Sequence, residues 1–189
     1  MKTVVWDLET TDLKALFGRV LCCSFAPADD FVDNAPDGCT DSVYTFRGDD
    51  KKYKTRSKLD DVKLCVAIRD ELEKYDLIVG QNIRLFDIPF LNARLAKGGE
   101  RPLRTHFVLD TMYYFRGVSM RIGSSKLENA QKFFKLPVSK TEIDWDTWRL
   151  AAMLEPEAMD IVVTHCEADV DVTRMLYPKV LPFVGTLHR

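Results

Sequence analysis

The chain has 189 residues, which favours one well-cored domain, because single domains typically hold roughly 100–200 residues. Hydrophobic residues make up 46% and charged residues 30% of it, and no apolar run approaches the ~20 residues that cross a bilayer, so the composition excludes a membrane protein. A net charge of −2 differs from that of a protein that coats nucleic acid, but an enzyme that holds a few nucleotides needs only a local basic rim.

The start of the chain and the cysteines favour a cytoplasmic protein. Residue 7 is already acidic, which is too early for the apolar region of a secretory signal peptide. The odd number of cysteines and the absence of a C-x-x-C pair indicate neither a disulfide framework nor a zinc site. We expect reduced, mostly buried thiols at Cys22, Cys23, Cys39, Cys65 and Cys166.

The first 58 residues predict two adjacent strands followed by loops. Apolar runs at residues 2–8 and 19–25 are separated by a turn around Asp12, and this spacing is typical of a hairpin. Between residues 27 and 58 the chain is rich in Asp, Pro, Gly and Lys, which predicts mobile loops. Within that region the short apolar stretch 43–46 predicts a third strand.

Helices and strands alternate in the rest of the chain. The spacing of apolar residues predicts helix 60–75, strand 77–79, helix 86–96 and strand 106–109. From Ser124 onward the chain is mainly helical, with breaks at Pro137 and Pro156. This order predicts an α/β domain with helices flanking a mixed central sheet of about five strands, in which a hairpin is extended by parallel strands through helical crossovers.

Asp7 and Glu9 form the first candidate site. They alternate with apolar residues at the end of the first predicted strand, so their side chains point to the same face. Two carboxylates held this close repel each other unless a cation lies between them, and such oxygen ligands suit Mg²⁺ or Mn²⁺. The alternative interpretation is a solvated strand end, which needs no metal.

Asp87 belongs to the second candidate segment, in which a strand ending at Gly80 runs into a helix. An acid near the start of a helix is often an ordinary cap or a partner of the helix dipole. The apolar neighbours Phe86, Phe90 and Leu91 make a solvated cap less favourable here. These residues alone leave both interpretations open.

His165 and Asp169 form the third candidate segment. They are four residues apart on a predicted helix and share one face, whereas Glu167 and Asp171 should lie on other faces. The ordinary interpretation is a charged or hydrogen-bonded pair within one helix. A catalytic interpretation depends on the two other segments.

Together the three segments resemble the exonuclease motifs of the DEDD superfamily, whose fold is RNase H-like. Residues 7–11 resemble the first motif, residues 82–87 the second and residues 165–169 the third, within a resemblance that runs from Val5 to Thr173. The strings Gly-x-Asn-x-x-x-Phe-Asp-x-Pro-Phe-Leu and Cys-x-x-Asp-Val resemble those of family B DNA polymerase exonuclease domains and of related free-standing nucleases. The resemblance implies an RNase H-like α/β fold and a single 3′–5′ exonuclease domain at residues 1–189.

The resemblance also implies the reaction. It makes metal ligands of Asp7, Glu9, Asp87 and Asp169. Two divalent ions, Mg²⁺ or Mn²⁺, would then support hydrolysis of phosphodiester bonds from the 3′ end, with release of nucleoside 5′-monophosphates. His165 stands where the family has Tyr or His and is implied to orient or deprotonate the attacking water. Three residues separate His165 from Asp169, as in the tyrosine subgroup, whereas the histidine subgroup has four.

The implied substrate contacts come from the same motifs. By position, the terminal nucleotide is held by Thr10, Leu13, Asn82 and Phe86. Asp12 stands where many relatives have Gly, and Asp tolerates a positive φ better than most residues, so the turn can be kept. The implied partners are 3′ ends of single-stranded DNA or RNA, with a polymerase or another replication or repair protein and a homodimer as open alternatives.

The remaining features have ordinary default interpretations. For other aromatic residues, including Trp145 and Trp148, we expect core packing, with base stacking as the alternative. The charged run at residues 49–56 is expected to be a solvated loop, with contact to a phosphate backbone as the alternative. For the whole chain, the alternative from another class is a non-catalytic nucleic-acid-binding or scaffold domain on the same fold.

Overall fold

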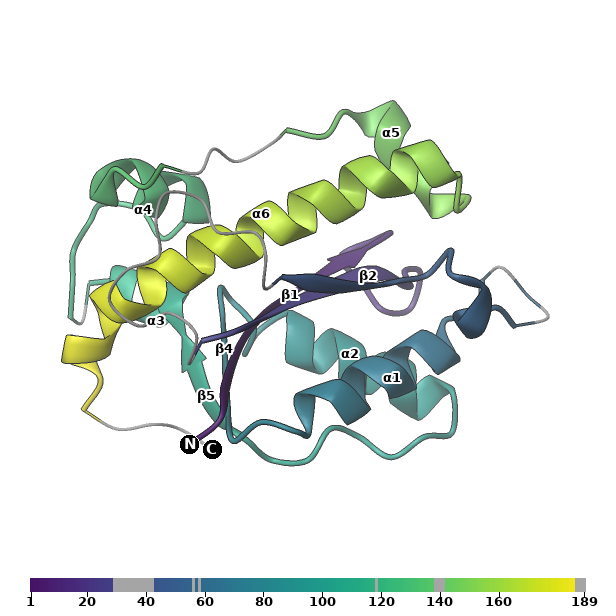
Figure 1. The fold of residues 1–189 in the computed structure, drawn as a ribbon, viewed down its shortest axis with the longest axis horizontal. Helices are drawn as coiled ribbons and strands as arrows, with labels where there is room; N and C mark the ends of the chain where they lie inside the picture. Colours follow the sequence, from purple (N-terminus) through teal and green to yellow (C-terminus); the bar gives the residue numbers. More distant parts are fainter. Residues whose placement is uncertain (29–42, 56, 58, 118, 138–141, 186–189) are drawn as a thin grey trace.

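A five-stranded sheet forms the centre of the computed structural model, which describes residues 1–28, 43–55, 57, 59–117, 119–137 and 142–185 (Figure 1). The strands are β1 (Thr3–Thr10), β2 (Val20–Pro27), β3 (Tyr44–Arg47), β4 (Leu77–Gly80) and β5 (Phe107–Asp110). The helices are α1 (Val62–Leu72), α2 (Asp87–Lys97), α3 (Thr111–Phe115), α4 (Leu127–Phe134), α5 (Trp145–Ala152) and α6 (Pro156–Val180), with short 3-10 helices η1 (Lys51–Tyr53) and η2 (Leu181–Phe183).

The sheet is mixed, as the sequence predicts. Its order is β3-β2-β1-β4-β5, with β2 antiparallel to both β1 and β3, and with β4 parallel to both β1 and β5. Parallel neighbours need a crossover connection, and α2 supplies it between β4 and β5. The carboxyl ends of β1, β4 and β5 therefore meet at one edge of the sheet, where Asp7 and Glu9 lie.

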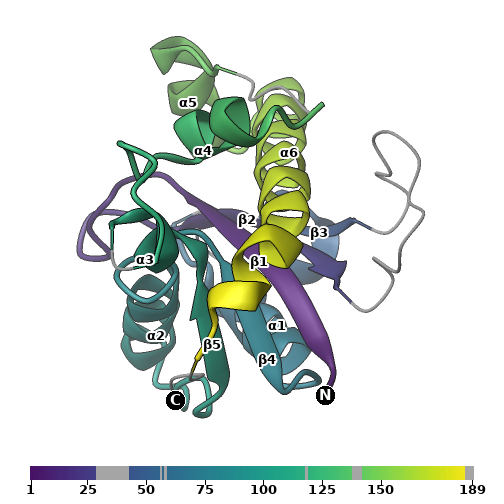
Figure 2. The same cartoon turned by 90° about the vertical axis from the view of Figure 1, so that its left-hand side faces the viewer.

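Helices cover both faces of the sheet. Helix α6 crosses one face, and α1 and α2 pack on the other (Figure 1, Figure 2). Along β1, Val4, Trp6 and Leu8 join the core beneath α1 and α2, whereas Val5 joins the core beneath α6. The strand is thus apolar on both faces until it reaches its two acids.

The region predicted as loops, residues 27–58, contains regular structure in its described part. Strand β3 lies there, as predicted, together with η1. In the charged run expected to be a solvated loop, residues 50–52 and 54 are exposed, whereas Tyr53 is buried and the Lys52 ammonium lies 4.8 Å from the centre of its ring. Residues 29–42, 56 and 58 lie outside the described residues.

The predicted helix breaks are confirmed. Helix α4 ends at Phe134, before Pro137, and Pro156 begins α6, because proline fits the first turn of a helix. Pro178 lies inside the last turns of α6 without ending it. Helix α3 was not predicted.

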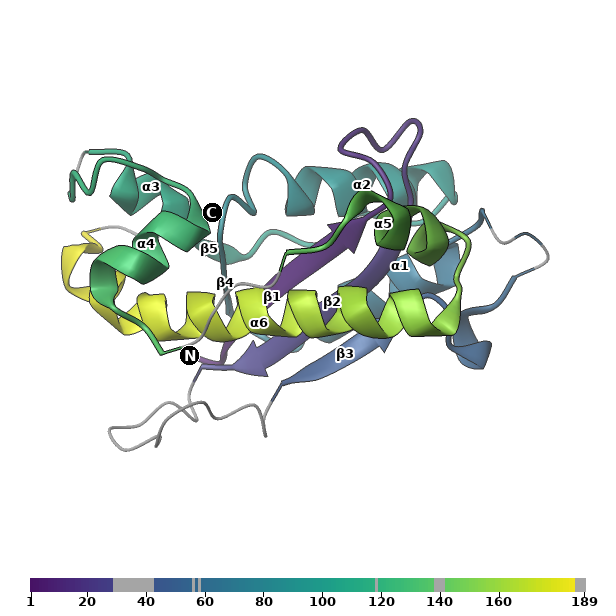
Figure 3. The same cartoon turned by 90° about the horizontal axis from the view of Figure 1, so that it is seen from above.

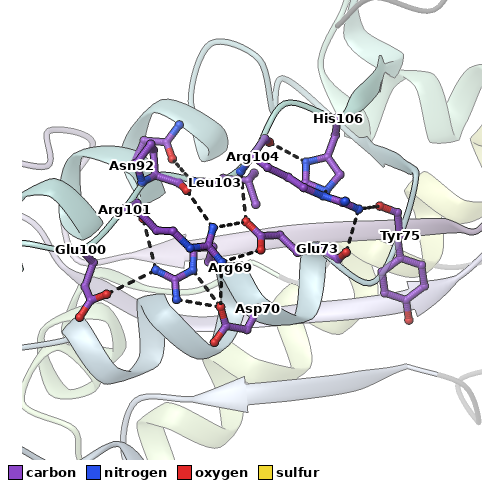
Figure 4. Close-up of polar contacts among 11 residues, drawn as sticks. Arg69, Asp70, Glu73, Tyr75, Asn92, Glu100, Arg101, Leu103, Arg104 and His106 are labelled. Carbon is purple, nitrogen blue, oxygen red and sulfur yellow. Dashed lines mark hydrogen bonds and ion pairs between the residues drawn. The ribbon is translucent and has the colours of Figure 1, made fainter.

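An ion-pair network lies at the sheet edge formed by the amino ends of β4 and β5 (Figure 4). The Arg101 guanidinium donates to the carboxylate of Glu73 at 2.6 and 2.7 Å and lowers the pKa of Glu73 to about 2. The Arg104 guanidinium donates to the carbonyls of Glu73 and Tyr75 at 2.8 and 3.1 Å. These bonds hold the chain between α2 and β5 against the end of α1.

Two further expectations concern membranes and thiols. Among the described helices, none is both long and apolar enough to cross a membrane. The described cysteines, Cys22, Cys23, Cys65 and Cys166, are free and buried, as expected. Cys39 lies outside the described residues.

Candidate active site

Asp7 and Glu9 lie on the face of β1 that is turned toward α6. The thiol of Cys166 on α6 donates to the backbone oxygen of Asp7 at 3.5 Å and to its carboxylate Oδ2 at 3.6 Å. Nε2 of His165 lies 3.8 Å from Oε1 of Glu9. The pairing of β1 with β2 shifts directly after Glu9, an irregularity that re-aims the end of a strand. Strand β1 and helix α6 thus bring the first and third predicted segments together.

Helix α6 supplies His165 and Asp169 from one face. Nε2 of His165 lies 3.9 Å from Oδ2 of Asp169, and both residues are 8% exposed. One ligand atom each from Glu9, His165 and Asp169 lies within 4.8 Å of the others, and the same holds for Asp7, Glu9 and Cys166. Two overlapping groups of potential ligands therefore share Glu9.

The neighbouring acids of α6 lie on other faces, as its periodicity predicts. Glu167 accepts a hydrogen bond from the Thr45 hydroxyl at 2.7 Å. Asp171 accepts one from the Arg174 guanidinium at 3.0 Å. The first hydrogen bond links α6 to β3, and the second lies within α6.

Asp87 is the first residue of α2 and is only 3% exposed. Phe86, and not Asp87, occupies the N-cap position, so Asp87 is not a cap, but it is the acid in the first turn of α2, where the helix dipole favours a negative charge. Burial raises the pKa of Asp87, and the charge of Asp7 raises it further. Burial also raises the pKa of Glu9, with the charges of Asp7, Asp169 and Asp87 adding to the effect. Asp7, Glu9 and Asp169 belong to the two groups of potential ligands, whereas Asp87 belongs to neither, although the charge of Asp7 acts on it.

The turn between β4 and α2 is held by Asp110 at the end of β5. Its carboxylate accepts hydrogen bonds from the N–H groups of Asn82 at 2.8 Å and Arg84 at 3.2 Å. Asn82 has a φ of 65°, which Asn adopts more readily than most residues. A Cβ atom at Gly80 would lie 2.2 Å from the side chain of Ile83, so only glycine fits there. The sheet edge thus fixes the backbone that leads into α2.

A cleft of about 750 Å³ opens beside Glu9. One wall is the connection between β1 and β2, and the other is α5 (Figure 3). Of the predicted site residues, Glu9, Thr10, Leu13 and Phe86 line this cleft. The other predicted site residues do not line it: Asp7, Asn82, Asp87, His165 and Asp169.

Comparison with known protein families identifies the superfamily of the fold. A family model of the RNase H superfamily matches residues 4–181. The chain belongs to the RNase H superfamily. The fold predicted from the sequence is therefore confirmed: the mixed five-stranded sheet flanked by helices is an RNase H-like α/β fold.

The RNase H-like fold also appears in a solved polymerase structure. The family B DNA polymerase from the hyperthermophilic archaeon Pyrobaculum calidifontis matches 97% of this chain with a TM-score of 0.69 and 17% sequence identity. The chain spans 25% of the length of that polymerase chain, and at this identity the likeness shows the fold. No curated protein matches the chain in a sequence comparison.

Nucleases of the RNase H superfamily typically use divalent metal ions, and the acids of this chain fit such ions. Mg²⁺ and Mn²⁺ prefer carboxylate oxygens, which Asp7, Glu9 and Asp169 offer within the two ligand groups. The charge of Asp7 raises the pKa of both Glu9 and Asp87, and a bound cation would reverse that effect. The donor chemistry and the electrostatics therefore suit a divalent cation.

Several features of the site were missed at the sequence level. The Trp148 ring packs edge-on against His165, with centroids 6.5 Å apart. The core-packing expectation is wrong for Trp145, Tyr113 and Phe133, which are 77%, 45% and 59% exposed. The sequence contained a signal for the exposure of Trp145. Asp144 is the N-cap of α5, so Trp145 is the first residue of the helix and precedes Trp148 and Ala151, which pack on α6.

Proposed function

We propose that this chain is a metal-dependent 3′–5′ exonuclease, formed by residues 1–189 as one domain, that trims single-stranded DNA or RNA and releases nucleoside 5′-monophosphates. The observation that carries the proposal is the convergence of Glu9, His165 and Asp169 within 4.8 Å, beside an open cleft on an RNase H-like fold. Strongly perturbed acids in a cleft are typical of functional sites.

In this proposal Asp7, Glu9, Asp87 and Asp169 hold two divalent ions, Mg²⁺ or Mn²⁺. Bound there, such ions lower the pKa of a water molecule and stabilise the charge that develops on the phosphate. By the resemblance of the motifs, Asp7 would be the ligand shared by the two ions. Water is the nucleophile, so the protein needs no covalent intermediate.

We assign to His165 the orientation or deprotonation of the attacking water. Its Nε2 lies 3.8 Å from Glu9 and 3.9 Å from Asp169, so the ring nitrogen faces the same space as the acids. The edge of the ring is packed against Trp148, which restricts its rotation. An imidazole can accept a proton near neutral pH, as this role requires.

The terminal nucleotide is assigned to the part of the cleft next to Glu9. Thr10, Leu13 and Phe86 line it and provide a hydroxyl and two apolar surfaces. We assign a structural role to Asn82, because its positive φ shapes the turn before α2. This role does not require contact between its side chain and the substrate.

The test is degradation of 5′-labelled single-stranded DNA, single-stranded RNA and duplexes by the purified protein with Mg²⁺ or Mn²⁺. We expect a ladder that shortens from the 3′ end and needs the cation. Asp7→Asn and Asp87→Asn should each lower the rate by more than about 100-fold, since even groups that only support a metal ligand are worth 10–100-fold. Glu157→Gln, an exposed acid in the first turn of α6, is the control and should match the wild-type protein.

Two results would contradict the proposal. Cation-independent binding without degradation would indicate the non-catalytic nucleic-acid-binding or scaffold domain. Full activity in both Asp7→Asn and Asp87→Asn would show that these acids do not form the catalytic centre.

A further inference from the structure

A separate pocket of about 260 Å³, called here the Arg19 pocket, lies where α6 begins. Three parts of the chain line it: Arg19 directly before β2, the segment between β3 and α1 with Lys54, and the start of α6 with Pro156. Figure 1 shows the starts of α1 and α6 at the same end of the molecule. None of the predicted site residues lines this pocket, and it shares no residue with the cleft beside Glu9. Its volume lies below the roughly 300–1,000 Å³ of pockets for drug-sized molecules, so it suits a small ligand.

The guanidinium of Arg19 is buried with little to compensate its charge. Arg19 is 6% exposed. Among the described residues, its guanidinium donates one hydrogen bond, to the carbonyl of Ala152 at the end of α5, and forms no ion pair. Burial lowers the pKa of Arg19, although the charge of Asp61 acts in the opposite direction. Buried charges are normally paired, and this guanidinium retains N–H donors that have no acceptor in the described part of the chain.

The acids that line the Arg19 pocket do not supply the missing partner. Asp61 is paired with the guanidinium of Arg94, at 2.7 Å. Asp49 accepts two hydrogen bonds from the guanidinium of Arg47, at 3.0 and 2.9 Å. Asp60 is exposed, so water and salt screen its charge. The buried positive charge is therefore left for a ligand.

The rest of the lining offers groups that attract an anion. The ammonium of Lys54 is exposed and forms no ion pair with the described acids. The hydroxyl oxygen of Ser57 accepts the N–H of Leu59 at 3.1 Å, which leaves the hydroxyl hydrogen for another acceptor. Helix α6 begins at Pro156, and the N-terminus of a helix carries a partial positive charge. Positive charge and hydrogen-bond donors thus surround one small hollow.

We propose that the Arg19 pocket binds a phosphate group, which the Arg19 guanidinium, the Lys54 ammonium and the Ser57 hydroxyl hold. The planar fork of a guanidinium matches the oxygens of phosphate, and such charge-assisted bonds are the strong ones. The group belongs either to free phosphate or to a nucleotide, and the small volume of the pocket favours free phosphate. This site is independent of the proposed exonuclease function, because it uses neither the catalytic acids nor a metal ion.

The test measures binding of inorganic phosphate to the purified protein in EDTA, so that no cation at the catalytic acids can hold the anion. Titration calorimetry gives the Kd, and the rise in Tm with phosphate concentration gives an independent value. Phosphate also stabilises folded proteins without binding, because it is excluded from their surface. That effect does not saturate and is shared by every variant, whereas the pocket should give a saturable isotherm.

Two variants remove the proposed contacts. Lys54→Ala and Arg19→Met each delete a charge-assisted bond and should weaken phosphate binding about tenfold. Lys51→Ala is the matched control, because it removes an exposed lysine of η1 that does not line the pocket, and its Kd should equal that of the wild type. If loss of the bond to Ala152 prevents Arg19→Met from folding, the exposed Lys54 still provides the test.

Thymidine 5′-monophosphate distinguishes the two sources of the phosphate group. Binding of inorganic phosphate alone would assign the pocket to free phosphate, and nucleotide binding that weakens in Lys54→Ala would assign it to the phosphate of a nucleotide. The inference is overturned if neither ligand binds saturably, or if each Kd is the same in the wild type, Lys54→Ala and Arg19→Met. These measurements need no nuclease activity, so the proposed function can fail without affecting them.

Discussion

Asp110 offers a direct test of how the fold positions the candidate site. Its carboxylate accepts the N–H groups of Asn82 and Arg84 in the turn before α2, and that of Met112, for which it is the N-cap of α3. Hydrogen bonds to charged groups contribute about 1.5–3 kcal/mol each, and an N-cap about 1 kcal/mol. Water can replace part of the two turn bonds, and burial of the carboxylate raises its pKa, which offsets part of the gain. We therefore expect Asp110→Ala to lower the free energy of unfolding by about 3 kcal/mol.

Asp110→Asn is the graded variant. Its amide oxygen can still accept from Asn82 and Met112, but its amide nitrogen would face the N–H of Arg84, so we expect a loss of about 1.5 kcal/mol. The turn leads directly into Asp87, so both variants should also lower kcat when the rate is expressed per folded molecule.

Urea unfolding in EDTA, followed by tryptophan fluorescence, measures the loss. Asp144→Ala is the matched control, because it removes the cap of α5 but leaves the turn intact, at about 1 kcal/mol. If Asp110→Ala costs no more than Asp144→Ala, the two turn bonds contribute nothing. A full kcat in folded Asp110→Ala would likewise refute its role in positioning Asp87.

Three other acids give further predictions. Burial raises the pKa of Glu9 above its ordinary 4.5, so the folded protein binds more protons than the unfolded chain. The stability of the metal-free protein should therefore fall as the pH rises from 4.5 through the pKa of Glu9 in the folded state. Glu9→Gln should therefore raise the Tm at pH 7 in EDTA, and an unchanged Tm in calorimetry would contradict this account. Asp61→Ala leaves the buried guanidinium of Arg94 without its ion pair, at 2.7 Å in the wild type, and should cost about 3–5 kcal/mol in urea titrations. Arg101 lowers the pKa of Glu73, so the stability from this pair is present above pH 4.5 and is lost as the pH falls toward 2. Because Arg101 is 56% exposed, Glu73→Gln should cost less than about 1 kcal/mol at pH 7, and its Tm should approach that of the wild type in acid.

The strands and longer helices could be predicted because their apolar side chains recur with the period of the element. The predicted helices at residues 60–75 and 86–96 correspond to α1 and α2, and all five predicted strands are present. Helix α3 escaped prediction because five residues are too short for a periodic pattern. Its start depends on the cap by Asp110, whose other bonds reach a turn that is distant in sequence.

The acids were predictable from the order of their three segments, whereas the walls of the cleft were not. Trp145 and Trp148 are the same residue type on one short helix, and only the packing of α5 on α6 buries one ring against His165 and exposes the other. The contact of Cys166 with Asp7 joins residues 159 positions apart, and no local pattern announces it. Tertiary packing, and not local sequence, decides such contacts.

The carboxyl edge of the sheet collects features that lower the stability of a fold. The pairing of β1 shifts directly after Glu9, and burial together with the charge of Asp7 raises the pKa of Asp87. Asn82, in the turn between β4 and α2, has a positive φ. The other described non-glycine residues with positive φ, Lys135 and Leu154, follow α4 and α5, where a left-handed residue is an ordinary helix end. Asn82 lies instead in the turn before α2, where asparagine tolerates this φ and the Asp110 carboxylate accepts its N–H. Local conflicts at one edge of an otherwise consistent fold are typical of functional sites, and a cation bound there would offset the effect of the Asp7 charge on Asp87.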